Sequence, residues 1–182
     1  MPHTVPQSML KICILGDGGV GKTTLVTRYL TGVFEGRLKI TIGVNFYVKK
    51  VEYNNKLFTL QLWDFAGEDR FRFILPSYLL GASGAIFMYD ITRYSSFKNF
   101  ESWHDVFLKG SERNEAQIPL LMVGSKLDLE YKRAVSLEDA QGLANSFNHI
   151  CDYIECSAKT GKNVEYIFKK ITKFVTNNSS LF

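Results

Sequence analysis

A short run near the N-terminus has residue types and spacing that can hold a chain of phosphates. Residues 16–23 read Gly-Asp-Gly-Gly-Val-Gly-Lys-Thr and match G-x-x-x-x-G-K-[ST] at every fixed position. Glycines let backbone N–H groups surround phosphate oxygens, and a following helix adds its positive N-terminal end. Lys22 supplies a point charge and the Thr23 hydroxyl can ligate Mg²⁺. The run therefore predicts a nucleoside triphosphate site, formed by Gly16, Asp17, Gly18, Gly19, Val20, Gly21, Lys22, Thr23 and Thr24.

A second group of residues suits a metal ion and the last phosphate of the chain. Asp64 closes a β-rich stretch, and a carboxylate there suits Mg²⁺ coordination beside a phosphate loop. Thr41 can place a second hydroxyl on the metal, although alone it reads as an ordinary strand residue. Gly67 lets the backbone approach a γ-phosphate. The predicted metal residues are Thr23, Thr41 and Asp64.

Polar residues that follow two later apolar runs suit a purine base. The Asp128 carboxylate can accept from both N–H donors on a guanine edge, a pair that adenine lacks, so it predicts guanine selection. The triplet Ser-Ala-Lys at 157–159 can offer backbone N–H groups to guanine O6, and its value comes from its order after the other motifs. The predicted base-side residues are Ser125, Lys126, Asp128, Ser157, Ala158 and Lys159.

Short apolar runs alternate with longer amphipathic stretches, and this pattern predicts the elements that position the motifs. Strands are expected at 9–15, 43–53, 57–63, 84–89, 118–123 and 151–156, and helices near 22–32, 95–109, 137–148 and 163–176. We therefore expect an α/β fold, a doubly wound, mostly parallel six-stranded sheet with helices on both faces. Ligands of such sheets bind beyond the carboxyl ends of the strands. Ser136 and Asp139 resemble a capping box at the third of these helices.

Length and composition are those of one globular domain. The chain has 182 residues, and we expect a domain at 9–176 between a flexible extension at 1–8 and a tail at 177–182. A net charge of +4 without a dense basic run predicts no nucleic-acid partner. Three irregularly spaced cysteines predict no disulfide framework, and Cys13 reads as a core residue. His104 and His149 are expected at the surface, as is the basic pair at 132–133.

In this order the motifs resemble those of the small GTPases of the Ras superfamily, over about residues 9–175. Residues 42–46, the Trp-Asp-x-Ala-Gly stretch at 63–67 and residues 78–92 are most similar to the Rab branch. The resemblance implies GTP or GDP with Mg²⁺ as ligands. It also implies Phe34 over the base and Lys126 along the guanine face. The residues it implies for catalysis are Lys22, Thr41, Gly67 and Glu68.

The resemblance also implies two nucleotide-dependent segments, switch I at 34–43 and switch II at 65–80. Effector, exchange and activating proteins would bind there. The tail contains no cysteine, so we expect no prenyl anchor at this end and a cytoplasmic monomer. A protein partner would recruit it to the periphery of a membrane.

Three residues depart from the usual pattern of these GTPases. Glu68 stands in place of the water-orienting glutamine, and an ionised carboxylate accepts hydrogen bonds but cannot donate them. Ser125 replaces an asparagine, which predicts retained guanine preference with faster exchange, and Phe65 replaces a threonine and reads as packing. Arg37 is the candidate for an arginine acting within the chain, so full speed is expected to need a partner's arginine.

Three functions stay open on the sequence. The first is a slow GTPase that works as a switch, and the second is a module that holds GTP with negligible hydrolysis because of Glu68. A kinase of another nucleotide is the third. Asp128 and the Ser-Ala-Lys triplet argue against the kinase, and a preference for ATP over GTP would revive it.

Overall fold

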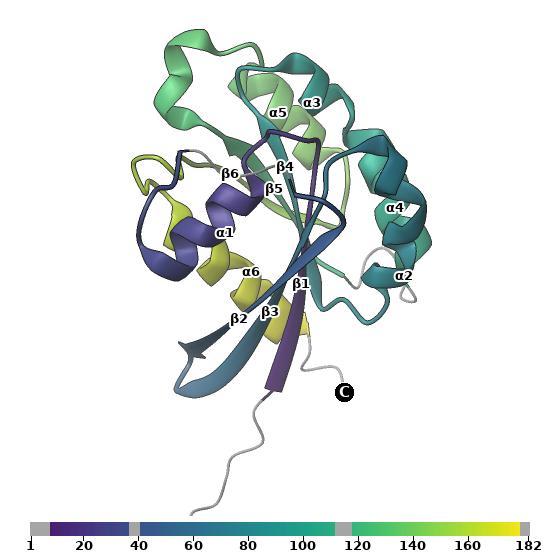
Figure 1. The fold of residues 1–182 in the computed structure, drawn as a ribbon, viewed down its shortest axis with the longest axis vertical. Helices are drawn as coiled ribbons and strands as arrows, with labels where there is room; N and C mark the ends of the chain where they lie inside the picture. The colour runs from purple at the N-terminus through teal and green to yellow at the C-terminus, as the bar shows by residue number, and fades with distance from the viewer. Residues whose placement is uncertain (1–7, 37–40, 112–117, 179–182) are drawn as a thin grey trace, which may run out of the picture.

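A mixed sheet between two helical layers forms the body of the protein, shown in Figure 1 as a computed structural model that describes residues 8–36, 41–111 and 118–178. Its strands are β1 (Ser8–Leu15), β2 (Val44–Tyr53), β3 (Lys56–Phe65), β4 (Gly84–Asp90), β5 (Leu120–Ser125) and β6 (Ile150–Glu155). Their spatial order is β2-β3-β1-β4-β5-β6. Only the β2–β3 pair is antiparallel. The predicted doubly wound, mostly parallel α/β sheet is confirmed.

The helices divide between the two faces of the sheet. They are α1 (Lys22–Thr31), α2 (Leu75–Leu79), α3 (Tyr94–Lys98), α4 (Phe100–Gly110), α5 (Leu137–Asn145) and α6 (Val164–Asn178). Helices α1 and α6 cover one face and α2 to α5 cover the other, so each face has its own apolar core (Figure 1). Within the described ranges no helix is long and apolar enough to span a bilayer.

Strand β1 shows why the buried strands read as continuous apolar runs. Ile12 and Ile14 pack into the core under α1 and α6, whereas Cys13 and Leu15 pack into the opposite core. Because successive side chains point to opposite faces and both faces are covered, every position favours an apolar residue. The prediction that Cys13 is a core residue is confirmed, and burial raises the pKa of its thiol to about 12.

The β2–β3 hairpin lies between two predicted site residues, Thr41 before β2 and Gly67 after β3. Its two-residue turn is Asn54-Asn55, with φ of 50° and 59°, and Tyr53 pairs with Lys56 across it. Positive φ at both central residues is the type I′ turn, which asparagine tolerates well. The strands expected at 43–53 and 57–63 therefore form a tight hairpin.

Two helical segments differ from the sequence prediction. The helix expected over 95–109 is broken at Asn99, which separates α3 from α4. In addition, a 3₁₀ helix, η1 (Asp69–Ile74), and α2 lie in the segment that was predicted only as switch II. Leu75 and Leu79, one turn apart, bury their side chains in the core of this face. These two residues span a single turn, and an apolar pattern of that length is too short to predict a helix from the sequence.

The expectation that His104 and His149 lie at the surface is wrong. Both are buried, with their Nε2 atoms 2.9 Å apart and their ring centroids 4.7 Å apart. His104 lies one turn after Phe100 on the apolar face of α4, and the two rings stack at 5.5 Å. Phe147 covers the pair. His104 lies four residues after Phe100, so the two side chains share one face of α4. This spacing was the sequence signal that His104 is buried.

Candidate nucleotide site

A cavity of about 530 Å³ opens where the phosphate loop (residues 16–23) meets the loops that follow β3, β5 and β6. Such a crevice at the carboxyl ends of the strands is where ligands of doubly wound sheets bind. The sequence motifs therefore converge in space. The predicted residues that line it are Gly18, Gly19, Val20, Gly21, Lys22, Thr23, Thr24, Phe34, Thr41, Gly67, Glu68, Ser125, Lys126, Asp128, Ala158 and Lys159.

Lys22 spans the phosphate loop from beneath. Its buried ammonium donates to the carbonyl oxygens of Gly16 at 2.7 Å and Asp17 at 2.8 Å. Burial lowers the pKa of Lys22 to about 8, although the nearby carboxylates of Asp64 and Asp17 act to raise it. Gly16 itself does not line this cavity. Its φ is 137° and a Cβ there would overlap the Met88 carbonyl, so only glycine fits.

Three oxygen-bearing side chains meet next to Lys22. The Thr23 hydroxyl donates to Asp64 Oδ2 at 2.5 Å and lies 2.6 Å from the Thr41 hydroxyl. Asp64 is fully buried below the cavity, and its Oδ1 has no hydrogen-bond partner among the described residues. Burial raises the pKa of Asp64, while the Thr23 hydrogen bond and the Lys22 charge act to lower it.

This oxygen cluster fits Mg²⁺. Hard oxygen donors suit that ion, and an unpartnered buried carboxylate oxygen is a polar group that a cation would satisfy. In the described ranges no three His, Cys, Asp or Glu side chains are grouped to hold a metal by themselves. A magnesium ion would therefore rely on the hydroxyls of Thr23 and Thr41, on Asp64 and on phosphate oxygens of the nucleotide.

Gly67 brings the end of β3 directly against the phosphate loop. The Gly18 N–H donates to the Gly67 carbonyl at 3.1 Å. A Cβ at Gly67 would overlap the backbones of Gly18 and Asp17, so a side chain would push the two segments apart. Next to it, Glu68 pairs with Arg70 at 2.6 Å, which offsets its negative charge.

The Asp17 carboxylate points away from the nucleotide cavity. It accepts from Trp103 Nε1 at 2.8 Å, from Asn99 Nδ2 at 2.8 Å and from the Arg72 guanidinium at 3.2 Å. Its main-chain carbonyl, in contrast, accepts a hydrogen bond from Lys22 within the phosphate loop. Asp17 therefore connects the phosphate loop to η1 and α4. The one-turn spacing of Asn99 and Trp103 was the available signal.

The Asp128 carboxylate is held by the Ser-Ala-Lys loop. Ser157 donates to Asp128 Oδ1 at 2.6 Å, and its own oxygen accepts from the Thr160 N–H at 3.1 Å. Ser157 is buried and does not line the cavity, whereas Asp128 does. Ser157 thus orients the Asp128 side chain.

Lys126 and Ser125 fix the loop that carries Asp128. Lys126 adopts a left-handed backbone with φ of 64° and its ammonium pairs with Asp90 at 2.6 Å. The Ser125 hydroxyl lies 2.6 Å from the Val20 carbonyl and 2.8 Å from the Tyr89 carbonyl. One hydroxyl has one proton, so it can satisfy only one of these carbonyls at a time. An asparagine has two N–H groups for the same task.

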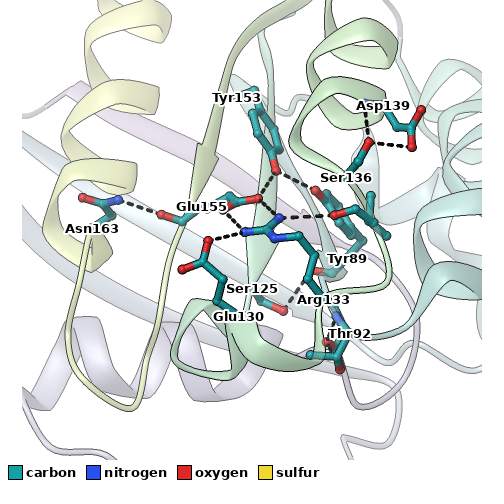
Figure 2. A network of polar contacts seen from close by, with 12 residues as sticks. Tyr89, Thr92, Ser125, Glu130, Arg133, Ser136, Asp139, Tyr153, Glu155 and Asn163 are labelled. Carbon is teal, nitrogen blue, oxygen red and sulfur yellow. Dashed lines mark hydrogen bonds and ion pairs between the residues drawn. The ribbon is translucent and has the colours of Figure 1, made fainter.

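A polar network beneath the base side joins β4, β5 and β6 (Figure 2). Arg133 donates to the two carboxylate oxygens of Glu155 from Nη1 at 2.6 Å and from Nη2 at 2.7 Å. The Tyr153 hydroxyl donates to Glu155 at 2.7 Å and lies 2.6 Å from the Tyr89 hydroxyl. Burial would raise the pKa of Glu155, but the hydrogen bonds from Arg133 and Tyr153 outweigh it and lower the pKa. The expectation that this arginine is solvated is wrong, because its carboxylate partner is contributed by a distant strand.

Other predicted residues have simpler positions. Phe34, with 38 % of its surface exposed, lines the mouth of the cavity. Phe65 is fully buried and its ring lies 6.3 Å from that of Tyr78, so it serves packing as predicted. Arg37 lies outside the described residues. Sequence analysis missed Arg93, whose guanidinium reaches the phosphate loop.

The family described as the Ras family matches residues 11–177. The chain belongs to the Ras family. Among similar proteins, this Ras family member is 42 % identical to Ras-related protein Rab7 of Drosophila melanogaster over 92 % of its own length and 80 % of the relative's. It is 38 % identical to Ras-related protein RABG3f of Arabidopsis thaliana, with 92 % and 82 % covered. It is 40 % identical to the Ypt/Rab-type GTPase avaA of Emericella nidulans, with 91 % and 81 % covered. The predicted Rab-like resemblance is confirmed.

Proposed function

We propose that this Rab-like member of the Ras family binds GTP and GDP with Mg²⁺, hydrolyses GTP slowly, and switches the segments around 34–43 and 65–80 between two states. One observation carries the proposal. A single cavity brings together the phosphate loop, the oxygen cluster at Thr23 and the Asp128 carboxylate that Ser157 holds. As a Rab-like Ras family protein the chain is a GTPase.

Guanine choice rests on Asp128. Its position in the cavity suits acceptance from the two N–H donors of guanine, and adenine cannot offer both. Phe34 covers the edge of the base, and Lys126 lies along its face. Backbone N–H groups of Ala158 and Lys159 would donate to guanine O6.

Phosphates and metal occupy the other end of the cavity. Lys22 binds the β- and γ-phosphates, and Thr23, Thr41 and Asp64 hold Mg²⁺ with its water molecules. A bound Mg²⁺ would supply positive charge against the charge that develops on the phosphate oxygens. The Asp64 carboxylate accepts the Thr23 proton, which leaves the oxygen lone pairs of Thr23 to serve as ligands.

Hydrolysis needs a water molecule in line with the γ-phosphorus. The water oxygen forms a bond to phosphorus while the bond to the β,γ-bridging oxygen breaks, and its electron pair leaves with GDP. One water proton stays on the new P–OH group and the other passes to a phosphate oxygen, which gives GDP and inorganic phosphate. Glu68 would accept from the water, but an ionised carboxylate cannot donate to a γ-phosphate oxygen, and this supports slow hydrolysis.

The switch surface would bind protein partners. Phe46 is 49 % exposed and Tyr78 39 % exposed, and both rings contact Trp63, at 5.2 and 6.0 Å. An exposed aromatic group of this kind suits effector, exchange and activating proteins. We propose a cytoplasmic monomer that such a partner recruits to a membrane periphery.

A second candidate function is a GTP-holding module with negligible hydrolysis. The observation that favours it is the acceptor-only Glu68 beside the γ-phosphate position. In this account the protein would signal by whether GTP is bound, without hydrolysing it.

Single-turnover hydrolysis tests the proposed function. The purified chain is loaded with GTP and Mg²⁺ and GDP is followed by chromatography, beside Glu68→Gln, an ATP arm and the control Glu138→Gln, which alters an exposed carboxylate of α5. We expect GDP formation in wild type and control at equal rates, with no ATP binding. GTP that stays intact for hours in wild type but not in Glu68→Gln would establish the holding module. ATP preferred over GTP would sink both.

A further inference from the structure

Arg93 reaches the phosphate loop from the segment that follows β4. It precedes α3, and its Nη2 donates to the carbonyl oxygen of Gly18 at 2.7 Å across 75 residues of sequence. Its Nη1 lies 3.7 Å from the place where a Cβ on Gly19 would stand. The guanidinium therefore rests on the two glycines that line the nucleotide cavity.

Two nitrogens of this guanidinium differ in their partners among the described residues. An arginine has five N–H donors in a fixed fork. Its Nε is buried with no partner among the described residues, and the bond to Gly18 engages only Nη2. A buried donor without an acceptor is costly, so the site favours a further acceptor.

A second cavity beside Arg93 shares lining residues with the nucleotide cavity. It measures about 360 Å³, and it is lined by Arg93 together with Gly18, Gly67 and Glu68, which line the nucleotide cavity too. Arg93 thus lies on the γ-phosphate side of the loop, opposite the base.

The charges around the loop call for an anion. The Gly18 carbonyl binds Arg93, and the Gly16 and Asp17 carbonyls bind the Lys22 ammonium, so two cations lie on neighbouring parts of one loop. The carboxylates in that neighbourhood bind other partners: Asp17 accepts from Arg72, and Glu68 pairs with Arg70. A terminal phosphate between Lys22 and Arg93 would balance both charges.

We propose that Arg93 is a built-in arginine of the phosphate site, which donates its spare N–H groups to the terminal phosphoryl group of GTP. This inference rests on the proposed function and deepens it. As the bond from phosphorus to the bridging oxygen breaks and the bond from water forms, negative charge on the transferring group grows, and a fixed cation stabilises it. Gly18 holds the guanidinium in place before the reaction begins.

Three variants separate charge from scaffold. Arg93→Gln keeps an N–H donor for the Gly18 carbonyl and removes the cation, and Arg93→Lys keeps the cation and removes the fork. The control Lys98→Ala removes an exposed cation from the same helix, α3. Each protein is measured for GDP affinity, for affinity toward a non-hydrolysable GTP analogue, and for single-turnover hydrolysis.

For Arg93→Gln we expect GDP affinity within about twofold of wild type, because GDP lacks the group that the arginine contacts. Affinity for the GTP analogue should fall by about tenfold, as expected for one charged hydrogen bond. Hydrolysis should slow by roughly 10²-fold, as when a donor to the developing charge is removed. Lys98→Ala should match wild type in all three.

One result would overturn the assignment. An unchanged ratio of the two affinities in Arg93→Gln would exclude contact with the terminal phosphate. If both affinities fall equally, Arg93 is a purely structural support of the loop. The affinity ratio decides this even if wild type fails to hydrolyse GTP, so failure of the proposed GTPase switch is a separate outcome.

Discussion

The two ends of the nucleotide cavity are built differently. At the base end, Arg133, Glu155 and Tyr153 form a partly buried network, and Ser157 locks Asp128. At the phosphate end, η1 contributes no buried residue, and Phe73 is 81 % exposed. The segment from Gly67 to η1 is held mainly by the Gly18 hydrogen bond and by Arg72 on Asp17, Ser102 and the Trp103 ring.

This contrast teaches how one fold can combine constant recognition with a movable sensor. Elements with dense buried contacts open rarely, whereas those with few buried contacts rearrange at low cost. The base end would therefore stay the same in both nucleotide states. The phosphate end would respond to the presence or absence of the γ-phosphate.

The largest effect is expected from the base end, in Asp128→Asn. Loss of two hydrogen bonds to an ionised acceptor should weaken GDP binding by about 10²-fold or more, measured by equilibrium titration. Asp152→Asn is the control, because it breaks the Asp152–Lys170 pair away from the cavity. GDP affinity within twofold of wild type in Asp128→Asn would remove guanine selection from this residue.

Arg133→Ala tests whether the network stiffens that end. With both proteins saturated by GDP, the free energy of unfolding in urea should fall by about 2 kcal/mol at neutral pH, since Glu155 loses its cation. Lys170→Ala breaks a more exposed pair and should cost less than about 1 kcal/mol. Equal losses in the two variants would contradict the contrast between buried and exposed contacts.

The same variant has a defined pH dependence. The pKa of Glu155 lies below its ordinary 4.5 in the folded protein, so its ionised form stabilises the fold above that pH. This stabilisation disappears as pH falls through the lowered pKa. The difference between wild type and Arg133→Ala should hold above pH 4.5 and narrow below it. If the difference in free energy of unfolding stays constant below pH 4.5, the Arg133–Glu155 ion pair does not cause it.

Ser125→Asn tests the place where the two ends of the cavity meet, because Ser125 contacts Val20 of the phosphate loop and Tyr89 of β4. An asparagine could serve the Val20 and Tyr89 carbonyls at the same time, and one added hydrogen bond should slow GDP release by about fivefold. Ser125→Ala should release GDP faster than wild type. Release rates come from displacement of a fluorescent GDP analogue. Release from Ser125→Asn at or above the wild-type rate would contradict the assignment.

The smallest effect on GDP is expected from Arg72→Gln at the phosphate end. GDP affinity should change by no more than about twofold, because Arg72 binds Asp17 outside the nucleotide cavity. Hydrogen exchange of the η1 amides should rise, since this side chain anchors the segment to α4. Unchanged exchange in η1 would show that other contacts hold it.

The sequence could predict what is local and could not predict what distant segments share. The phosphate loop follows from one continuous motif, and the strands follow from apolar runs such as β1. Arg93 and Arg133 carry no pattern of their own, because their partners Gly18 and Glu155 are 75 and 22 residues away. Asp17 was predicted as part of the nucleotide site because it sits in the motif. Its outward turn depends on the partners that α4 contributes.

Hydrogen exchange of the protein loaded with GDP and with a non-hydrolysable GTP analogue tests the central claim most directly. We predict that amides at 65–80 exchange more slowly with the GTP analogue, and that amides of β6 and of the 3₁₀ helix η3 (Leu127–Lys132) are unchanged. Equal exchange at 65–80 in the two states, or equal changes at both ends of the cavity, would contradict a rigid base end joined to a nucleotide-sensing phosphate end.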